Sequence, residues 1–260
     1  MSGSVRVSKE GHVGHIVFDH PERRNAITAA MWDEIPEAAA ELSRDPQIRV
    51  VVMRGVGETA FVSGADISEF ESTRTGSAAQ EYDARNSRAF SALARIEKPL
   101  IALIHGFCVG GGCAIALTAD LRFAAEDAVF AIPAGRLGLG YGLDGLETLV
   151  GVVGLPAAKE IFFTARRFSA EEALQIGLVN RVLAKSQLDE YVEGVVGQIS
   201  QNAPLTLKGA KLALGQIARS SEKRDLGAVE SAIAACFESE DYKEGVRAFL
   251  EKRTPVFKGR

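Results

Sequence analysis

Between Pro99 and Ala119 the sequence has no Asp, Glu, Lys or Arg, yet it contains Gly106 and the triplet Gly110-Gly111-Gly112. An uncharged run of this length would suffice for a membrane-spanning helix. A glycine triplet near its centre instead favours a buried strand, a tight loop and a buried helix in succession. Free N–H groups at such a helix start would attract an anionic or polarised oxygen. The segment therefore predicts an oxyanion-binding or phosphate-binding turn, with close helix–strand packing as the simpler alternative.

Short β-like runs alternate with helical patterns over the first two thirds of the chain. This alternation predicts an α/β core with crossover connections. Thr28 is expected to cap the first helix, in which Pro36 is an awkward break. The polar residues 71–77 predict a mobile loop. We expect strands at 13–19, 50–54, 100–105, 121–124 and 128–132, and helices at 28–42, 84–96 and 112–119.

After about residue 185 the pattern is helical throughout, with helices expected at 188–200, 205–218, 226–236 and 242–251. No strand-like run interrupts them, so this tail is predicted to pack on the core or on a neighbouring subunit. We expect a core of residues 1–195 and a helical C-terminal segment of residues 196–260.

Composition and charge exclude several classes of protein. Apolar residues make up 47% of the chain and charged residues 25%, as in ordinary folded proteins. The net charge of −4 comes from mixed signs, so no basic surface indicates nucleic-acid binding. Three cysteines form neither a disulfide framework nor a metal-ligand pattern with the four histidines. No targeting segment is evident, and we expect a cytoplasmic protein without a metal.

Several linked motifs, in order along nearly the whole chain, resemble the crotonase (enoyl-CoA hydratase/isomerase) superfamily. The resemblance implies a spiral of ββα repeats with a C-terminal helical trimerisation segment, in a trimer or dimer of trimers. It also implies an acyl-CoA thioester substrate and no cofactor beyond its CoA moiety. The motifs lie at residues 21–26, 63–67, 110–112, 133–138, 163–164, 173–180 and 244–253.

The resemblance also assigns roles to individual residues. In that family two backbone amides, here those of Ala65 and Gly111, donate to the thioester carbonyl and stabilise an enolate. By the same resemblance Ser63, Ala65 and Ile67 line an adenine pocket, and Phe249 and Lys252 contact CoA from a neighbouring subunit. Arg23 or Arg24 is a candidate phosphate ligand, because guanidinium binds phosphate through two hydrogen bonds; a solvated surface charge is the alternative for these cations.

The chain departs from the family's hydratases at both catalytic glutamates, where Ala114 and Ala134 stand. Hydration needs acid/base groups that alanine cannot supply. Tyr141 and Asp144 are the candidate replacements. A tyrosine in a similar setting occurs in methylmalonyl-CoA decarboxylases of the superfamily, although their loop is shorter and they have His where Ala65 stands. Simple packing of Tyr141 and helix capping by Asp144 are the alternatives.

We therefore expect an acyl-CoA enzyme, a lyase or isomerase, that acts through a thioester enolate. Hydration, isomerisation and decarboxylation all stay open as its reaction. A non-catalytic acyl-CoA-binding homologue is the alternative from another class. A nucleotide-binding module is disfavoured, because no acidic ribose partner or phosphate lysine lies at the expected spacing. His105 is expected to be a core residue.

Overall fold

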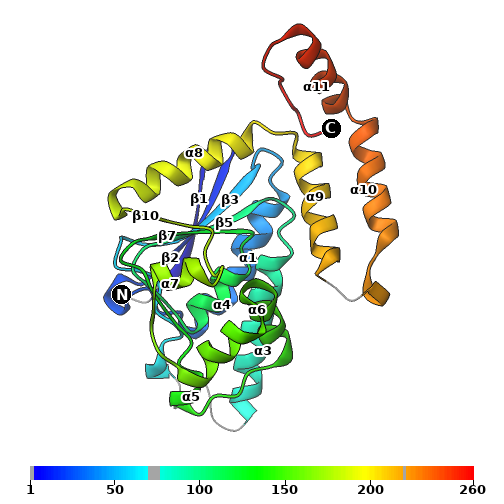
Figure 1. The fold of residues 1–260 in the computed structure, drawn as a ribbon. Coiled ribbons are helices and arrows are strands. Elements are labelled where there is room, and N and C mark those ends of the chain that lie inside the picture. The colour runs from blue at the N-terminus through cyan, green and yellow to red at the C-terminus, as the bar shows by residue number, and fades with distance from the viewer. Residues whose placement is uncertain (1–2, 70–76, 219–220) are drawn as a thin grey trace.

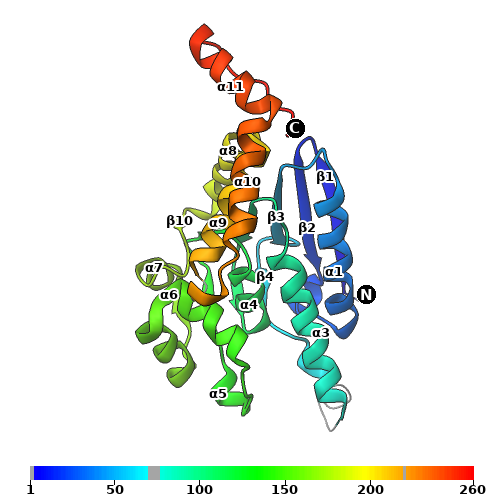
Figure 2. The same cartoon turned by 90° about the vertical axis from the view of Figure 1, so that its right-hand side faces the viewer.

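The computed structural model describes residues 3–69, 77–218 and 221–260 and confirms the expected α/β fold (Figure 1). The loop expected over residues 71–77 lies outside the described residues up to residue 76. Two sheets run through the core, and helices cover them on both sides (Figure 2).

The larger sheet has six strands, and all neighbours in it are parallel except the first pair. Strand β1 is antiparallel to β2 and was not predicted from the sequence. In spatial order the strands are β1 (Ser4–Glu10), β2 (Val13–Asp19), β3 (Val50–Gly55), β5 (Leu100–Ile104), β7 (Leu121–Ala125) and β10 (Arg181–Leu183).

The smaller sheet has four short strands, in the order β4 (Ala60–Val62), β6 (Phe107–Val109), β8 (Val129–Ala131) and β9 (Phe168–Ser169). The first three are parallel and β9 is antiparallel to β8. Each of three successive chain segments gives one strand to the large sheet, one to the small sheet, and then a helix. This is the expected ββα repeat.

Helix α1 (Ala29–Arg44) shows how the local sequence builds these units. Thr28 caps it by accepting a hydrogen bond from the Met31 amide. Its apolar residues recur at helical spacing and are buried, so the helix continues through Pro36 without the expected break. The other helices of the core are α3 (Ser77–Ala94), α4 (Gly111–Leu117), α5 (Ala134–Leu137), α6 (Leu143–Thr164) and α7 (Ala170–Gln175).

Helix α8 (Leu188–Ser200) covers the opposite face of the large sheet from α1 (Figure 1). Leu188, Val192 and Val196 pack there on strand residues such as Val50 and Ile101. Because Val196 belongs to this cluster, the expected division between residues 195 and 196 falls inside a helix that packs on the core.

Helices α9 (Pro204–Ile217), α10 (Leu226–Glu238) and α11 (Glu240–Glu251) form an arm that extends from the core (Figure 2). Lys211 of α9 joins the arm to the core through the Lys98 carbonyl and the Asp120 carboxylate. The Arg49 guanidinium binds the carbonyls of Ser200 and Phe257, so the chain end after α11 returns to the core.

Candidate active site

Two glycine-containing turns meet at one edge of the small sheet. Strands β4 and β6 are parallel neighbours, so the turns that follow them emerge side by side. The first turn carries Ala65 and the second carries Gly111. A Cβ atom on Gly111 would lie only 3.8 Å from the amide nitrogen of Ala65. The structure thus brings together the two residues whose amides the sequence singled out.

Both amides are free to donate. Ile27 pairs with the residues flanking Ala65, donating to the Gly64 carbonyl at 2.8 Å and accepting from the Asp66 amide at 2.9 Å. Because parallel pairing uses those flanking groups, the Ala65 N–H points away from Ile27. Gly111 is the first residue of α4, where N–H groups have no partner within the helix. Neither amide has an acceptor in the part of the chain that the structure describes.

The close approach of the turns explains their glycines. A Cβ on Gly112 would overlap the Val62 carbonyl, so a larger residue would push helix α4 away from strand β4. Gly64 has a φ of +116°, a conformation that L-residues rarely adopt. The backbone itself therefore forms the site, and its two donors can bind one oxygen that carries developing negative charge.

Trp32 of α1 supports this site from behind, a role the sequence analysis missed. Its ring carbon Cζ2 lies 3.3 Å from the position of a Cβ on Gly111. The indole is 1% exposed, donates from Nε1 to the Tyr82 hydroxyl at 3.0 Å and meets the Phe90 ring edge-on at 5.4 Å. The sequence feature that could have indicated this role is the position of the chain's single tryptophan on the apolar face of a predicted helix.

Ala114 and Ala134 are the two positions at which the sequence resemblance predicted missing glutamates. Ala114 lies one turn after Gly111 in α4, where its amide donates to the Gly110 carbonyl. Ala134 begins α5 and is 3% exposed. Neither methyl group can transfer a proton.

Tyr141 and Asp144 lie at the amino-terminal end of α6. The Tyr141 ring packs edge-on against Phe162 with centroids 4.9 Å apart and is 37% exposed. The helix begins at Leu143 behind Gly142, so Asp144 lies inside the first turn and is not the N-cap. Its carboxylate there is favourably placed with respect to the helix dipole. A catalytic role for either side chain stays a prediction.

The other predicted CoA-binding residues of the core gather around the first turn. The Ser63 amide donates to the Arg24 carbonyl at 3.2 Å, and the Ser63 hydroxyl donates to the Arg23 carbonyl at 3.1 Å. Ile67 is 58% exposed in the short helix that follows. The structure thus brings Arg23, Arg24, Ser63, Ala65 and Ile67 together.

Phe249 and Lys252 lie apart from this group within one chain. They belong to the end of α11, which both views place at the far end of the molecule from α5 and well away from α4 (Figures 1 and 2). Phe249 is 83% exposed. The structure therefore does not bring these two residues to the glycine turns.

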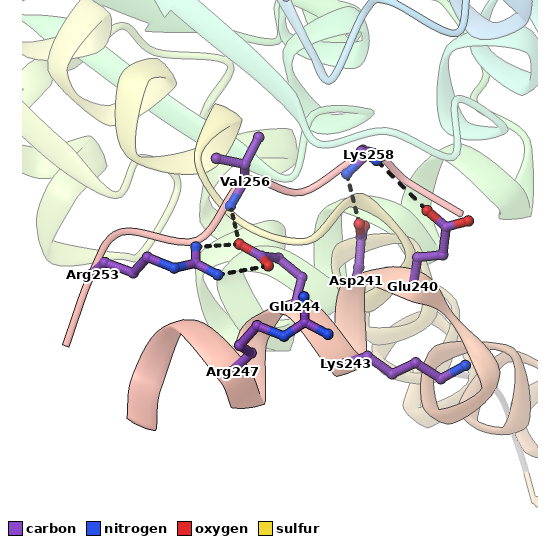
Figure 3. Close-up of a pocket in the computed structure, with 8 residues that line it drawn as sticks. All are labelled: Glu240, Asp241, Lys243, Glu244, Arg247, Arg253, Val256 and Lys258. Carbon is purple, nitrogen blue, oxygen red and sulfur yellow. Dashed lines mark hydrogen bonds and ion pairs between the residues drawn. The ribbon is translucent and has the colours of Figure 1, made fainter. Parts of the chain in front are cut away.

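A cavity of about 380 Å³ lies between α11 and the chain end (Figure 3). Glu244 accepts two hydrogen bonds from the Arg253 guanidinium and one from the Val256 amide, and Asp241 accepts from the Lys258 and Gly259 amides. The hydrogen bonds from Arg253 lower the pKa of Glu244 to about 2. These carboxylates bind the chain end to α11. The polar residues around the cavity are therefore explained by a structural role.

His105 is a core residue, as predicted. It is 2% exposed, and its Nε2 lies 2.7 Å from an Asp189 carboxylate oxygen. Arg54 binds the other oxygen of Asp189 at 2.7 Å. Burial acts to raise the pKa of Asp189, but the hydrogen bond from His105 and the charge of Arg54 outweigh it and lower that pKa. This cluster joins α8 to strand β3 and to the residue that follows strand β5.

Within residues 3–69, 77–218 and 221–260, no helix has the length and apolarity to cross a membrane. The same residues hold no cluster of three or more His, Cys, Asp or Glu side chains with metal-binding geometry.

Comparison with known proteins finds full-length similarity. A family model described as enoyl-CoA hydratase/isomerase matches residues 8–260. The short-chain-enoyl-CoA hydratase of Clostridium acetobutylicum is 35% identical over 250 residues, covering 96% of this chain and 95% of that protein. The peroxisomal Delta(3,5)-Delta(2,4)-dienoyl-CoA isomerase of Arabidopsis thaliana is 33% identical over 265 residues, covering 97% and 95%. The crystal structure of an enoyl-CoA hydratase/carnithine racemase from Magnetospirillum magneticum has a TM-score of 0.95 at 31% identity, covering 100% of this chain and 97% of that one.

Proposed function

Because this chain belongs to the enoyl-CoA hydratase/isomerase family, we propose that it stabilises the enolate of an acyl-CoA thioester with the amides of Ala65 and Gly111. One observation carries the proposal: two amides on neighbouring turns have no acceptor in the described chain, with Ala65 N lying 3.8 Å from a Cβ position on Gly111. When a bond at the α or β carbon is made or broken, charge builds up on the thioester oxygen. Fixed donors aimed at that oxygen accelerate such steps, and each contributes about 10²–10³-fold in rate.

The missing carboxylates shape the proposed reaction. Water addition by the two-glutamate route has no acid or base at Ala114 and Ala134. Formation and reprotonation of an enolate needs a single proton-handling group, for which Tyr141 and Asp144 are the candidates. We therefore propose a lyase or isomerase reaction in which these loop residues take over proton transfer.

Decarboxylation is the second candidate. It releases carbon dioxide from a 2-carboxyacyl-CoA, leaves the electron pair in the enolate and ends with protonation at the α carbon. Such a reaction requires the two amides, a place for the leaving carboxylate and one proton source. Tyr141, 37% exposed at the start of α6, is the proposed source.

We also propose that the working protein is a trimer or a dimer of trimers. The arm exposes large apolar side chains that a partner copy would cover, including Leu214, Ile217, Leu226, Phe237 and Leu250, each at least 60% exposed. A neighbouring copy would also bring Phe249 and Lys252 to the CoA bound by Arg23, Arg24, Ser63 and Ile67. Light scattering behind size-exclusion chromatography measures the mass; a monomer at micromolar concentration would contradict this arrangement.

The reaction is tested by mass spectrometry of products formed in deuterated water. Crotonyl-CoA, 3-hexenoyl-CoA and methylmalonyl-CoA are supplied separately to the wild type and to Tyr141→Phe and Asp144→Asn variants. Deuterium uptake with a shifted double bond indicates isomerisation, and loss of carbon dioxide indicates decarboxylation. Either activity should fall at least about hundredfold in one of the variants, the lower end of the range for a general acid or base.

Two outcomes would contradict the proposal. Rapid addition of water to crotonyl-CoA that both variants retain would mean that hydration proceeds without these loop residues. Tight binding of acyl-CoA thioesters without turnover or α-proton exchange would instead favour a non-catalytic acyl-CoA-binding protein.

A further inference from the structure

The outer face of the small sheet carries an aromatic ring with two cations beside it. Phe130 and Phe168 point into the core, whereas Phe107 lies on the opposite, half-exposed face. The Arg24 guanidinium carbon is 4.7 Å from the centroid of the Phe107 ring, and that of Arg167 is 6.0 Å from it. Both distances fall within the range of cation–π contact. The two like charges are therefore held near one another by elements that lie far apart in the sequence.

No carboxylate neutralises this pair among the described residues. Neither Arg24 nor Arg167 takes part in an ion pair there. The adjacent Arg166 gives the contrast, since it binds Glu160 and Glu172 at 2.7 Å each. Two unneutralised guanidinium groups around one ring repel each other, and an anion bound by both would offset that repulsion.

The backbone at Arg24 is held by the buried side chain that follows it. Arg24 and Asn25 have φ values of +52° and +56°, which non-glycine residues adopt only at a cost. The Asn25 side chain, 1% exposed, accepts from the His20 amide and donates to the carbonyls of Val56 and Ala60. Because the Arg24 carbonyl also accepts from Ser63, this loop is rigidly joined to the turn that presents the Ala65 amide.

We propose that Arg167 is a phosphate-binding residue, acting with Arg24 beside Phe107 on the phosphate groups of the CoA moiety. This inference rests on the proposed acyl-CoA function. A guanidinium group can donate two hydrogen bonds to the oxygens of one phosphate. Contact with the Phe107 ring orients both guanidinium groups before the ligand binds. Arg167 directly precedes β9, a strand of the small sheet. In this proposal the small sheet therefore positions the phosphate-binding arginine as well as the two amide donors.

The experiment is a set of calorimetric titrations with three thioesters that share one acyl group. Butyryl-CoA has all the phosphates, butyryl-3′-dephospho-CoA lacks the 3′-phosphate, and S-butyryl-pantetheine has none. Each is titrated into the wild type, Arg167→Gln and the matched control Arg166→Gln. Thermal unfolding of the three proteins checks that each is folded.

We expect Arg167→Gln to raise the Kd for butyryl-CoA by about tenfold or more, as for a lost hydrogen bond to a charged group. Its Kd for the pantetheine thioester should stay within about twofold of the wild-type value. Arg166→Gln should match the wild type for every ligand. A defect that persists with the dephospho ligand assigns the contact to the diphosphate, and one that disappears assigns it to the 3′-phosphate.

Unchanged butyryl-CoA binding by Arg167→Gln would overturn the inference, as would an equal loss for the pantetheine thioester. Either result would leave the proposed function intact, because the wild type would still bind the thioesters. Failure of the folded wild type to bind any of the three would instead count against the proposed function itself.

Discussion

A methyl group added at Gly111 should disturb both stability and the oxyanion site. In Gly111→Ala the new carbon would lie 3.3 Å from Cζ2 and 3.4 Å from Cη2 of Trp32. Carbon atoms prefer separations of about 3.5–4.0 Å, so something must move. Trp32 is fully buried, hydrogen-bonded to Tyr82 and packed against Phe90, so its side chain cannot easily move away from the added methyl group. We expect a loss of about 1–3 kcal/mol in the free energy of unfolding.

The same strain should displace the Gly111 amide from its place beside Ala65. A displacement of a few tenths of an ångström weakens one of two donors, for which we expect a rate loss of about tenfold to hundredfold. Trp32→Phe shortens the ring, so the Gly111→Ala/Trp32→Phe double variant should be more stable than the sum of the single changes by about 1 kcal/mol.

Urea unfolding followed by far-UV circular dichroism measures these stabilities without depending on tryptophan fluorescence. The rate of α-proton exchange on an acyl-CoA gives the activity. Equal stability of Gly111→Ala and the wild type, or strictly additive effects in the double variant, would refute the argument that Trp32 fixes this turn.

Three further predictions concern the rest of the chain. Asn25→Ala should lower the free energy of unfolding by about 3 kcal/mol, because buried partners of the Asn25 amide lose their hydrogen bonds; urea unfolding that shows a loss below about 1 kcal/mol would be inconsistent with this. Carboxyl NMR should give Glu244 a pKa of about 2, below the pKa of 4.5 of an unpaired glutamate. Its pairing with Arg253 therefore stabilises the arm fully above pH 4.5, and this stabilisation is lost as the pH falls from 4.5 toward 2. A titration midpoint near 4.5 would contradict the pairing. A thiol reagent should modify one cysteine per native chain, Cys236, which is half-buried, and all three cysteines after unfolding. Burial excludes the reagent from Cys108 and Cys113 and raises the pKa of the Cys108 thiol. A second fast-reacting thiol in the native protein would contradict the observed burial.

Long periodic elements could be predicted from the sequence, because their signal is local. The helix expected at 188–200 and the strand expected at 13–19 match α8 and β2. Strand β1 was missed, because it has only Val5 and Val7 as apolar residues and lies at the sheet edge with most of its other residues exposed. Strands β4 and β6 have three residues each, too few to show a period.

In the candidate site too, locally encoded features could be predicted and contacts between distant residues could not. The family resemblance predicted the amides of Ala65 and Gly111, and the structure brings these two residues together, while their role stays a prediction. The contacts of Trp32 with Gly111 and of Arg167 with Phe107 join residues that are far apart in the sequence, and no local pattern encodes them. Asp144 shows the opposite error, since this plausible capping residue lies two residues after the actual N-cap, Gly142.

The central claim is that the Ala65 amide stabilises a thioester enolate, and deletion of that N–H tests it most directly. Ala65→Pro removes the donor without breaking a hydrogen bond of the described chain, and Ala65→Gly keeps it as the control. The measurement is the rate of deuterium exchange at the α carbon of butyryl-CoA in deuterated water. We predict wild-type exchange within about threefold for Ala65→Gly and a loss of about 10²–10³-fold for Ala65→Pro, with butyryl-CoA binding and thermal unfolding retained. Exchange at the wild-type rate in a folded Ala65→Pro protein would contradict the claim.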